Sequence, residues 1–125
     1  MVFEHFALNV TEIHKRVDWF VVHLGLQVVV AQEKSPFMTF LADTTGRVML
    51  ELYHKEEEPL SNFKERHPAT FHVAFVSDNA EGDKLRLVAE GATLVEEVKR
   101  EGLHLVMLRD PWGMPLQLCQ RAKKF

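Results

Sequence analysis

Four polar residues recur at matching intervals in the two halves of the chain, and their side chains are of the types that bind metal ions. They are His5 and Glu51 in the first half and His72 and Gln117 in the second. The intervals agree to within one residue, since 72 minus 5 is 67 and 117 minus 51 is 66. This set of two imidazoles, a carboxylate and an amide oxygen suits divalent Fe, Mn, Ni, Co or Zn. The set contains no sulfur ligand, which would restrict the choice of metal.

Each of these residues lies in a segment that is predicted to form a β-strand, and apolar side chains occupy the other face of that strand. Alternate residues of a strand face opposite ways. The four apolar rows are Phe6, Leu8 and Val10; Val48, Leu50 and Leu52; Phe71, Val73 and Phe75; Leu116 and Leu118. Small Ala7 and Ala74 leave space beside the two histidines. We therefore expect the apolar rows to face helices and the four polar side chains to face a common cleft.

A duplicated module explains the matching intervals. The segment His5-Phe6-Ala7-Leu8 is echoed by His72-Val73-Ala74-Phe75. After each comes a helical pattern that ends at a glycine, Gly25 in the first half and Gly91 in the second. The expected buried faces are Ile13, Val17, Val21 and Leu24 in one helix and Leu85, Val88 and Ala89 in the other, which a capping box over Asp78–Glu81 precedes.

Both helices are followed by three strands, of which the last begins after a matching turn. Asp43-Thr44-Thr45-Gly46 precedes one last strand and Asp110-Pro111-Trp112-Gly113 the other. The sequence thus predicts an α+β fold of two βαβββ modules in tandem. We place module one at 1–55, a proline-broken linker at 56–69 and module two at 70–125, within one domain of 125 residues.

Composition excludes several classes of function. Fifteen basic and 18 acidic residues give a formal net charge of -3. The chain therefore lacks the strong positive field that favours binding to nucleic acid. The single cysteine, Cys119, excludes an intrachain disulfide and a thiolate zinc site, and favours a reducing compartment. No export signal or membrane-spanning segment is evident, so we expect a cytoplasmic protein.

The motifs HFALNV, HVAFVS, VMLELY and DPWGMPLQL resemble the glyoxalase/bleomycin resistance/dioxygenase (vicinal oxygen chelate) superfamily over residues 3 to about 120. The resemblance implies a curved mixed sheet around a cleft, as in dihydroxybiphenyl dioxygenase, with His5, Glu51, His72 and Gln117 as metal ligands. It also implies a small-molecule substrate and a homodimer. Whether the two ligand pairs meet within one chain or across two stays open.

The resemblance implies a lyase, isomerase or dioxygenase that chelates a small oxygenated metabolite. Gln117 stands where glyoxalase I usually has a glutamate, and an amide cannot move a proton. Glu51 is therefore the candidate catalytic residue. Asn9 and Lys55 replace the glutathione-binding residues, which disfavours classical glyoxalase I. The alternatives are a metal-free binding protein of the bleomycin-resistance type and, with least support, a purely structural subunit.

The other polar and aromatic candidates have simpler interpretations. His14, His23 and His67 are expected in solvent, His54 points away from Glu51, and Trp19 and Trp112 are expected to pack. His104 has apolar neighbours on both sides and is a weaker candidate for the pocket wall, as are Tyr53 and Cys119, which share the faces of Glu51 and Gln117.

Overall fold

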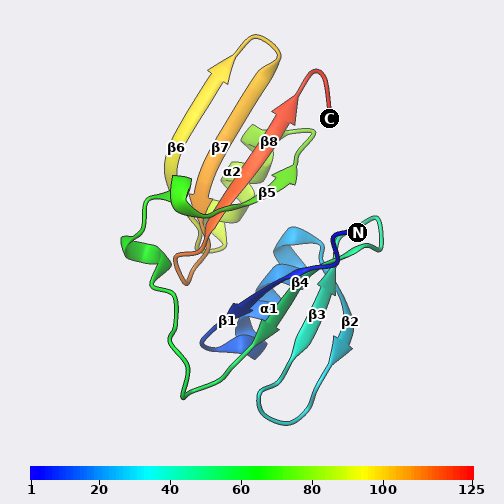
Figure 1. The fold of residues 1–125 in the computed structure, drawn as a ribbon. Helices are drawn as coiled ribbons and strands as arrows, with labels where there is room; N and C mark the ends of the chain where they lie inside the picture. Colours follow the sequence, from blue (N-terminus) through cyan, green and yellow to red (C-terminus); the bar gives the residue numbers. More distant parts are fainter. The chain divides into compact units, whose positions relative to one another are not determined.

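The computed structural model describes all of residues 1–125, which form two compact units, Met1–Ser61 and Asn62–Phe125. The division falls within the range 56–69 that the sequence predicts as a linker. Each unit has one four-stranded sheet and one α-helix (Figure 1). Two short 3-10 helices, η1 (Phe63–Glu65) and η2 (Pro68–Thr70), precede the first strand of the second unit.

The first unit is a βαβββ module. Its elements are β1 (Phe6–Asn9), α1 (Ile13–Leu24), β2 (Gln27–Ala31), β3 (Thr39–Ala42) and β4 (Val48–Tyr53). The strand order is β1-β4-β3-β2, with β1 parallel to β4 and the other pairs antiparallel. The first and last strands of the module are therefore direct neighbours.

The second unit repeats this plan. Its elements are β5 (Val73–Val76), α2 (Ala80–Ala89), β6 (Thr93–Arg100), β7 (Leu103–Arg109) and β8 (Pro115–Arg121). The order is β5-β8-β7-β6, and β5 is again parallel to β8. The predicted α+β fold with two βαβββ modules and mixed sheets is confirmed.

The core of each unit lies between its sheet and its helix, which covers one face of the sheet (Figure 1). Leu41, Leu50 and Leu52 are buried in the first unit, and Val106, Leu108 and Leu116 in the second. Alternation along the strands separates these side chains from the polar ones, because neighbouring residues point to opposite faces. We call the opposite face, which carries Ala7 and Glu51 in one unit and Ala74 and Gln117 in the other, the open face.

The two turns before the last strands have the same hydrogen bonds. In the first, Gly46 N donates to Asp43 O, and in the second, Gly113 N donates to Asp110 O. Both glycines have positive φ, 82° and 94°, which side chains disfavour. Each aspartate also accepts from a backbone N–H two residues on, Thr45 at 2.8 Å and Trp112 at 2.9 Å. The repeated Asp and Gly positions thus fix the start of β4 and β8.

The predicted buried face of α2 is wrong. Leu85 and Val88 are 62% and 43% exposed, and Ala89 is also exposed, whereas Leu87 and Ala80 are fully buried. A short helix with apolar residues on two sides has no unique inner face by sequence alone. The cap is displaced too: Asn79 accepts from Gly82 N at 3.0 Å, so the helix begins one residue later than a cap at Asp78 implies.

The buried face of α1 also differs from the expected one. Ile13 is buried as expected, but Val21 is exposed and Val17 and Leu24 are half-buried. Phe20, Trp19 and Arg16 are buried instead, and the Arg16 Nε donates to Thr11 O. The spacing of apolar residues does not predict that an arginine is buried. The predicted end at Gly25 is confirmed, with φ of 70°.

Neither α1 nor α2 has the length and apolar character that a membrane-spanning helix requires.

Leu87 and Leu85 offer a matched test of the α2 orientation. Leu87→Ala should lower the free energy of unfolding by about 2–5 kcal/mol, because it removes a fully buried side chain. Leu85→Ala, on the exposed side, should change it by less than about 0.5 kcal/mol. Urea unfolding followed by circular dichroism measures both, and the reverse order would show that α2 presents its other face to the sheet.

Candidate functional site

The structure brings His5 and Glu51 together on the open face of the first unit. Register pairs Ala7 with Glu51 across the parallel strands, and His5 directly precedes β1. His5 Nε2 lies 3.2 Å from Glu51 Oε2, and the two side chains are 23% and 16% exposed. No lysine or arginine contacts either of them. His5 and Glu51 thus form a half-buried pair of possible nitrogen and oxygen ligands without a lysine or arginine beside them.

The second ring nitrogen of His5 is buried without a hydrogen bond. Nδ1 lies 3.1 Å from Glu4 Oε2, but it makes no hydrogen bond there. The ring packs edge-on against Phe40, with centroids 5.1 Å apart, which limits its rotation. The ring thus lies between the half-buried Glu51 carboxylate and the exposed Glu4 carboxylate.

Asn9, on the same face, has a structural role. Its amide donates to Lys55 O at 3.0 Å and to Glu58 O at 3.3 Å, and its Oδ1 accepts from Lys55 N at 2.8 Å. These bonds hold the chain that leaves β4 against the end of β1. Asn9 therefore supports the strands that carry His5 and Glu51.

His72 and Gln117 lie at the equivalent places of the second unit. His72 Nδ1 lies 3.0 Å from Pro68 O, so this nitrogen carries the proton and Nε2 is the acceptor in the neutral ring. Gln117 pairs in register with Ala74, and its Oε1 accepts from Cys119 Sγ at 3.3 Å. No hydrogen bond joins His72 to Gln117.

A hollow of about 360 Å³ adjoins Gln117. Ala74 and Cys119 line it on the open face, and the C-terminal Phe125 and the basic Arg121 lie at its edge. Cys119 therefore lines a hollow, as its alternation with Gln117 suggests. The lining is mainly apolar, which is typical of a site for a small organic molecule.

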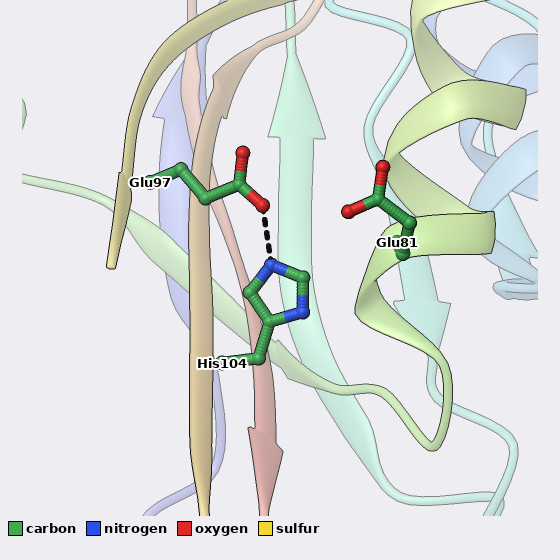
Figure 2. Close-up of side chains that lie close together, drawn as sticks. All are labelled: Glu81, Glu97 and His104. Atoms are coloured by element: carbon green, nitrogen blue, oxygen red, sulfur yellow. Dashed lines mark hydrogen bonds and ion pairs between the residues drawn. The ribbon is translucent and has the colours of Figure 1, made fainter. Parts of the chain in front are cut away.

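A second group of potential metal ligands escaped the sequence analysis. Glu81 on α2, Glu97 on β6 and His104 on β7 have ligand atoms within 4.8 Å of one another. Figure 2 shows Glu97 bonded to His104 and Glu81 facing them from the helix. His104 thus lies on the helix side of the sheet and not on the open face. The signal was available, because Glu97 and His104 flank the hairpin turn at Gly102.

Lys84 already supplies a cation to this group. Its Nζ lies 2.8 Å from Glu81 and 3.0 Å from Glu97, and the side chain is only 14% exposed. The hydrogen bond from His104, followed by that from Lys84, holds the pKa of Glu97 below its ordinary value. Glu81 and Glu97 in turn raise the pKa of Lys84. The Glu81, Glu97 and His104 group is therefore a salt-bridge network that fastens α2 to the sheet.

The remaining histidines have local roles. His54 Nδ1 lies 2.7 Å from Val10 O, so His54 joins the ends of β1 and β4. His67 caps η2 by accepting from Ala69 N. His14 and His67 are exposed, whereas His23 is half-buried beside Trp19. Trp19 is buried, as expected of a packing residue.

The sequence model of the Glyoxalase/Bleomycin resistance protein/Dioxygenase superfamily matches residues 2–118 of the chain. No curated protein matches the sequence. Among solved structures, the antibiotic binding protein TnmS3 from Streptomyces sp. CB03234 has a TM-score of 0.68 at 18% identity, over 97% of this chain and 96% of that one.

Two further solved structures have the same fold. The fosfomycin resistance protein FosX from Listeria monocytogenes has a TM-score of 0.72 at 16% identity, over 95% of this chain and 92% of that one. A glyoxalase/bleomycin resistance protein from Streptomyces sp. CB03234 has a TM-score of 0.65 at 18% identity, over 95% and 100% of the two chains. These likenesses show a shared fold.

The Lys84 network predicts a pH-dependent stability difference. At about pH 7, Glu97→Gln should lower stability, because the ionised carboxylate loses its contacts with Lys84 and His104. As the pH falls, the unfolded chain binds a proton at Glu97 before the folded chain does. The wild type therefore loses this contribution as the pH falls through the lowered pKa, and the two proteins should converge.

Urea unfolding at several pH values measures this difference. Glu96→Gln is the matched control, because Glu96 lies beside Glu97 on β6 and forms no ion pair. A gap between Glu97→Gln and the wild type that stays constant into acid would contradict the assigned network.

Proposed function

Because the chain belongs to the Glyoxalase/Bleomycin resistance protein/Dioxygenase superfamily, we propose that it is a metal-dependent enzyme that acts on a small oxygenated metabolite. The proposed ligands are His5, Glu51, His72 and Gln117. The observation that carries the proposal is the 3.2 Å separation of His5 Nε2 and Glu51 Oε2 on an open face without a lysine or arginine partner.

The donor atoms of the first unit fit a divalent ion. Bonds of about 2.0–2.2 Å from adjacent nitrogen and oxygen ligands place the two donors roughly 3.0–3.4 Å apart. The observed 3.2 Å lies in that range. The Nδ1 of His5 lies 3.1 Å from Glu4 Oε2 without a hydrogen bond, so the acceptor that usually orients a ligating histidine is near the ring but not engaged.

The second unit offers a comparable pair. The hydrogen bond from His72 Nδ1 to Pro68 O leaves Nε2 unprotonated in the neutral ring. A histidine that binds a metal ion through Nε2 requires this tautomer. Gln117 Oε1 accepts one weak bond from the Cys119 thiol and keeps a second lone pair. The set carries one formal negative charge, so a bound divalent ion keeps a net positive charge and acts as a Lewis acid toward substrate oxygens.

Glu51 is the proposed catalytic residue. Between Glu51 and Gln117 only the Glu51 carboxylate can take up and return a proton, since the amide of Gln117 has no basic site of that kind, and Glu51 would leave the metal ion to do so. The Glu51 side chain is 16% exposed and neighbours Ala7, whose small side chain leaves room for a substrate. The reaction class that follows is a lyase, isomerase or dioxygenase step on an oxygen-bearing carbon skeleton.

Metal analysis tests the proposal. Protein purified without chelator should contain about one divalent ion per site, measured by inductively coupled plasma mass spectrometry, and His5→Ala and His72→Ala should each remove it. Glu97→Gln is the control, because it alters the other histidine–glutamate pair and should leave the content unchanged. A wild type that neither carries nor takes up Fe, Mn, Ni, Co or Zn would refute the proposal. A screen of diols, α-oxo acids, thiohemiacetals and catechols then identifies the substrate.

The hollow beside Gln117 favours one alternative function, a metal-free small-molecule binding protein. The hollow has a volume of about 360 Å³ and a mainly apolar lining, which suits an organic ligand without any ion. TnmS3, which has a similar fold, is an antibiotic binding protein. This alternative predicts that a bound ligand raises the melting temperature equally with and without chelator. Loss of the ligand effect on chelation would instead favour the metal-dependent enzyme.

A further inference from the structure

The longest strand of the chain, β6, forms an outer edge of the second sheet (Figure 1). It pairs with β7 on one side, and no other segment forms backbone hydrogen bonds with it. All eight of its residues are exposed, and they include the apolar Leu94, Val95 and Val98. A long uncovered edge presents unpaired backbone groups to another strand, and proteins usually shorten or cover such edges.

The last five residues of β6 have a charge pattern that is complementary to itself. The strand ends in Glu-Glu-Val-Lys-Arg, so two acidic and two basic residues flank Val98. When two copies run antiparallel with Val98 opposite Val98, Glu96 lies opposite Arg100 of the second copy. Glu97 then lies opposite its Lys99. Opposite charges on directly paired residues stabilise a sheet, and like charges destabilise it.

Charge selects this register over the adjacent ones. A pairing centred on Glu97 places two carboxylates opposite one another, and a pairing centred on Lys99 places two ammonium groups opposite one another. Only the pairing centred on Val98 sets an apolar residue against itself and gives each charge of the strand an opposite partner. Charges that serve only to keep other strands away from an edge need no such symmetry.

The faces of the sheet match in this pairing. The register with β7 places Glu96, Val98 and Arg100 on the open face, and Glu97 and Lys99 on the helix side. Each pair of opposite charges therefore lies on one side of the combined sheet. Glu96, Lys99 and Arg100 form no ion pair within the unit, whereas Glu97 is already bonded there. The pair of Glu96 with Arg100 is thus the one that a second copy completes on both sides.

We propose that β6 is a self-association surface, at which a second copy of this chain adds its own β6 in antiparallel orientation about Val98. Main-chain hydrogen bonds and the paired charges hold the two edges together in a continuous sheet. A contact of five residues from each copy is small, so the dimer should dissociate on dilution. This pairing is independent of the proposed metal ligands, none of which lies on β6.

Charge reversal tests the pairing by sedimentation velocity over a range of concentrations. Glu96→Arg and Arg100→Glu each place like charges opposite one another at two positions. Each variant alone should therefore associate about tenfold or more weakly than the wild type. An equal mixture of the two variants regains opposite charges at both positions and should associate about as strongly as the wild type.

The mixture separates this surface from any other. A dimer formed elsewhere on the chain responds neither to the reversals nor to mixing. A wild type that does not associate, reversals that leave association unchanged, or a mixture that associates no more strongly than its parts would each overturn the proposal.

Cysteine trapping reads out the register directly. Val98→Cys places two thiols opposite one another at the symmetry axis, within reach of a disulfide, so mild oxidation should give a covalent dimer on a non-reducing gel. Val95→Cys is the matched control, because Val95 is a valine of the same strand with similar exposure, 40% against 46%. The same pairing keeps its two thiols roughly 20 Å apart. Equal yields of covalent dimer from the two variants would contradict a pairing centred on Val98.

Discussion

The parallel pairing of the first and last strands within each module is the constraint on which the candidate site depends. It aligns Ala7 with Glu51 and Ala74 with Gln117, residues that are 44 and 43 positions apart in the chain. Because the strands are parallel neighbours, a histidine just before the first strand stands near a polar residue of the last. The helix that follows the first strand covers the other face, so the polar side chains remain on the open one.

The repeat made the fold and the adjacency of His5 and Glu51 predictable. Strand alternation placed His5 and Glu51 on one face, and the Asp and Gly turns fixed the last strands, since these are local or symmetric features. The inner face of α2 was not predictable, because Leu85 and Leu87 are equally apolar and only the sheet selects between them. The contact of Glu97 with His104 follows from the register of the β6–β7 hairpin, in which Lys99 pairs with His104 and Glu97 with Val106, a register that was not assigned from the sequence.

The protein contains two histidine–glutamate pairs, and their surroundings give them different roles. Glu97 and His104 have Lys84 within the same network, and its ammonium group compensates the carboxylates internally. His5 and Glu51 have no such partner, and Glu4 adds a further negative charge beside the ring. Two pairs with similar side chains therefore differ in whether a lysine of the chain lies beside them.

This difference follows from which face of the sheet each pair occupies. On the helix side, α2 brings Lys84 to the carboxylates of Glu81 and Glu97. The open face of the first unit has no helix to supply a lysine, and Glu51 there has His5 as its ion-pair partner. The pair in the second unit thus belongs to a network that holds α2 against its sheet, whereas the pair in the first unit has no lysine or arginine partner.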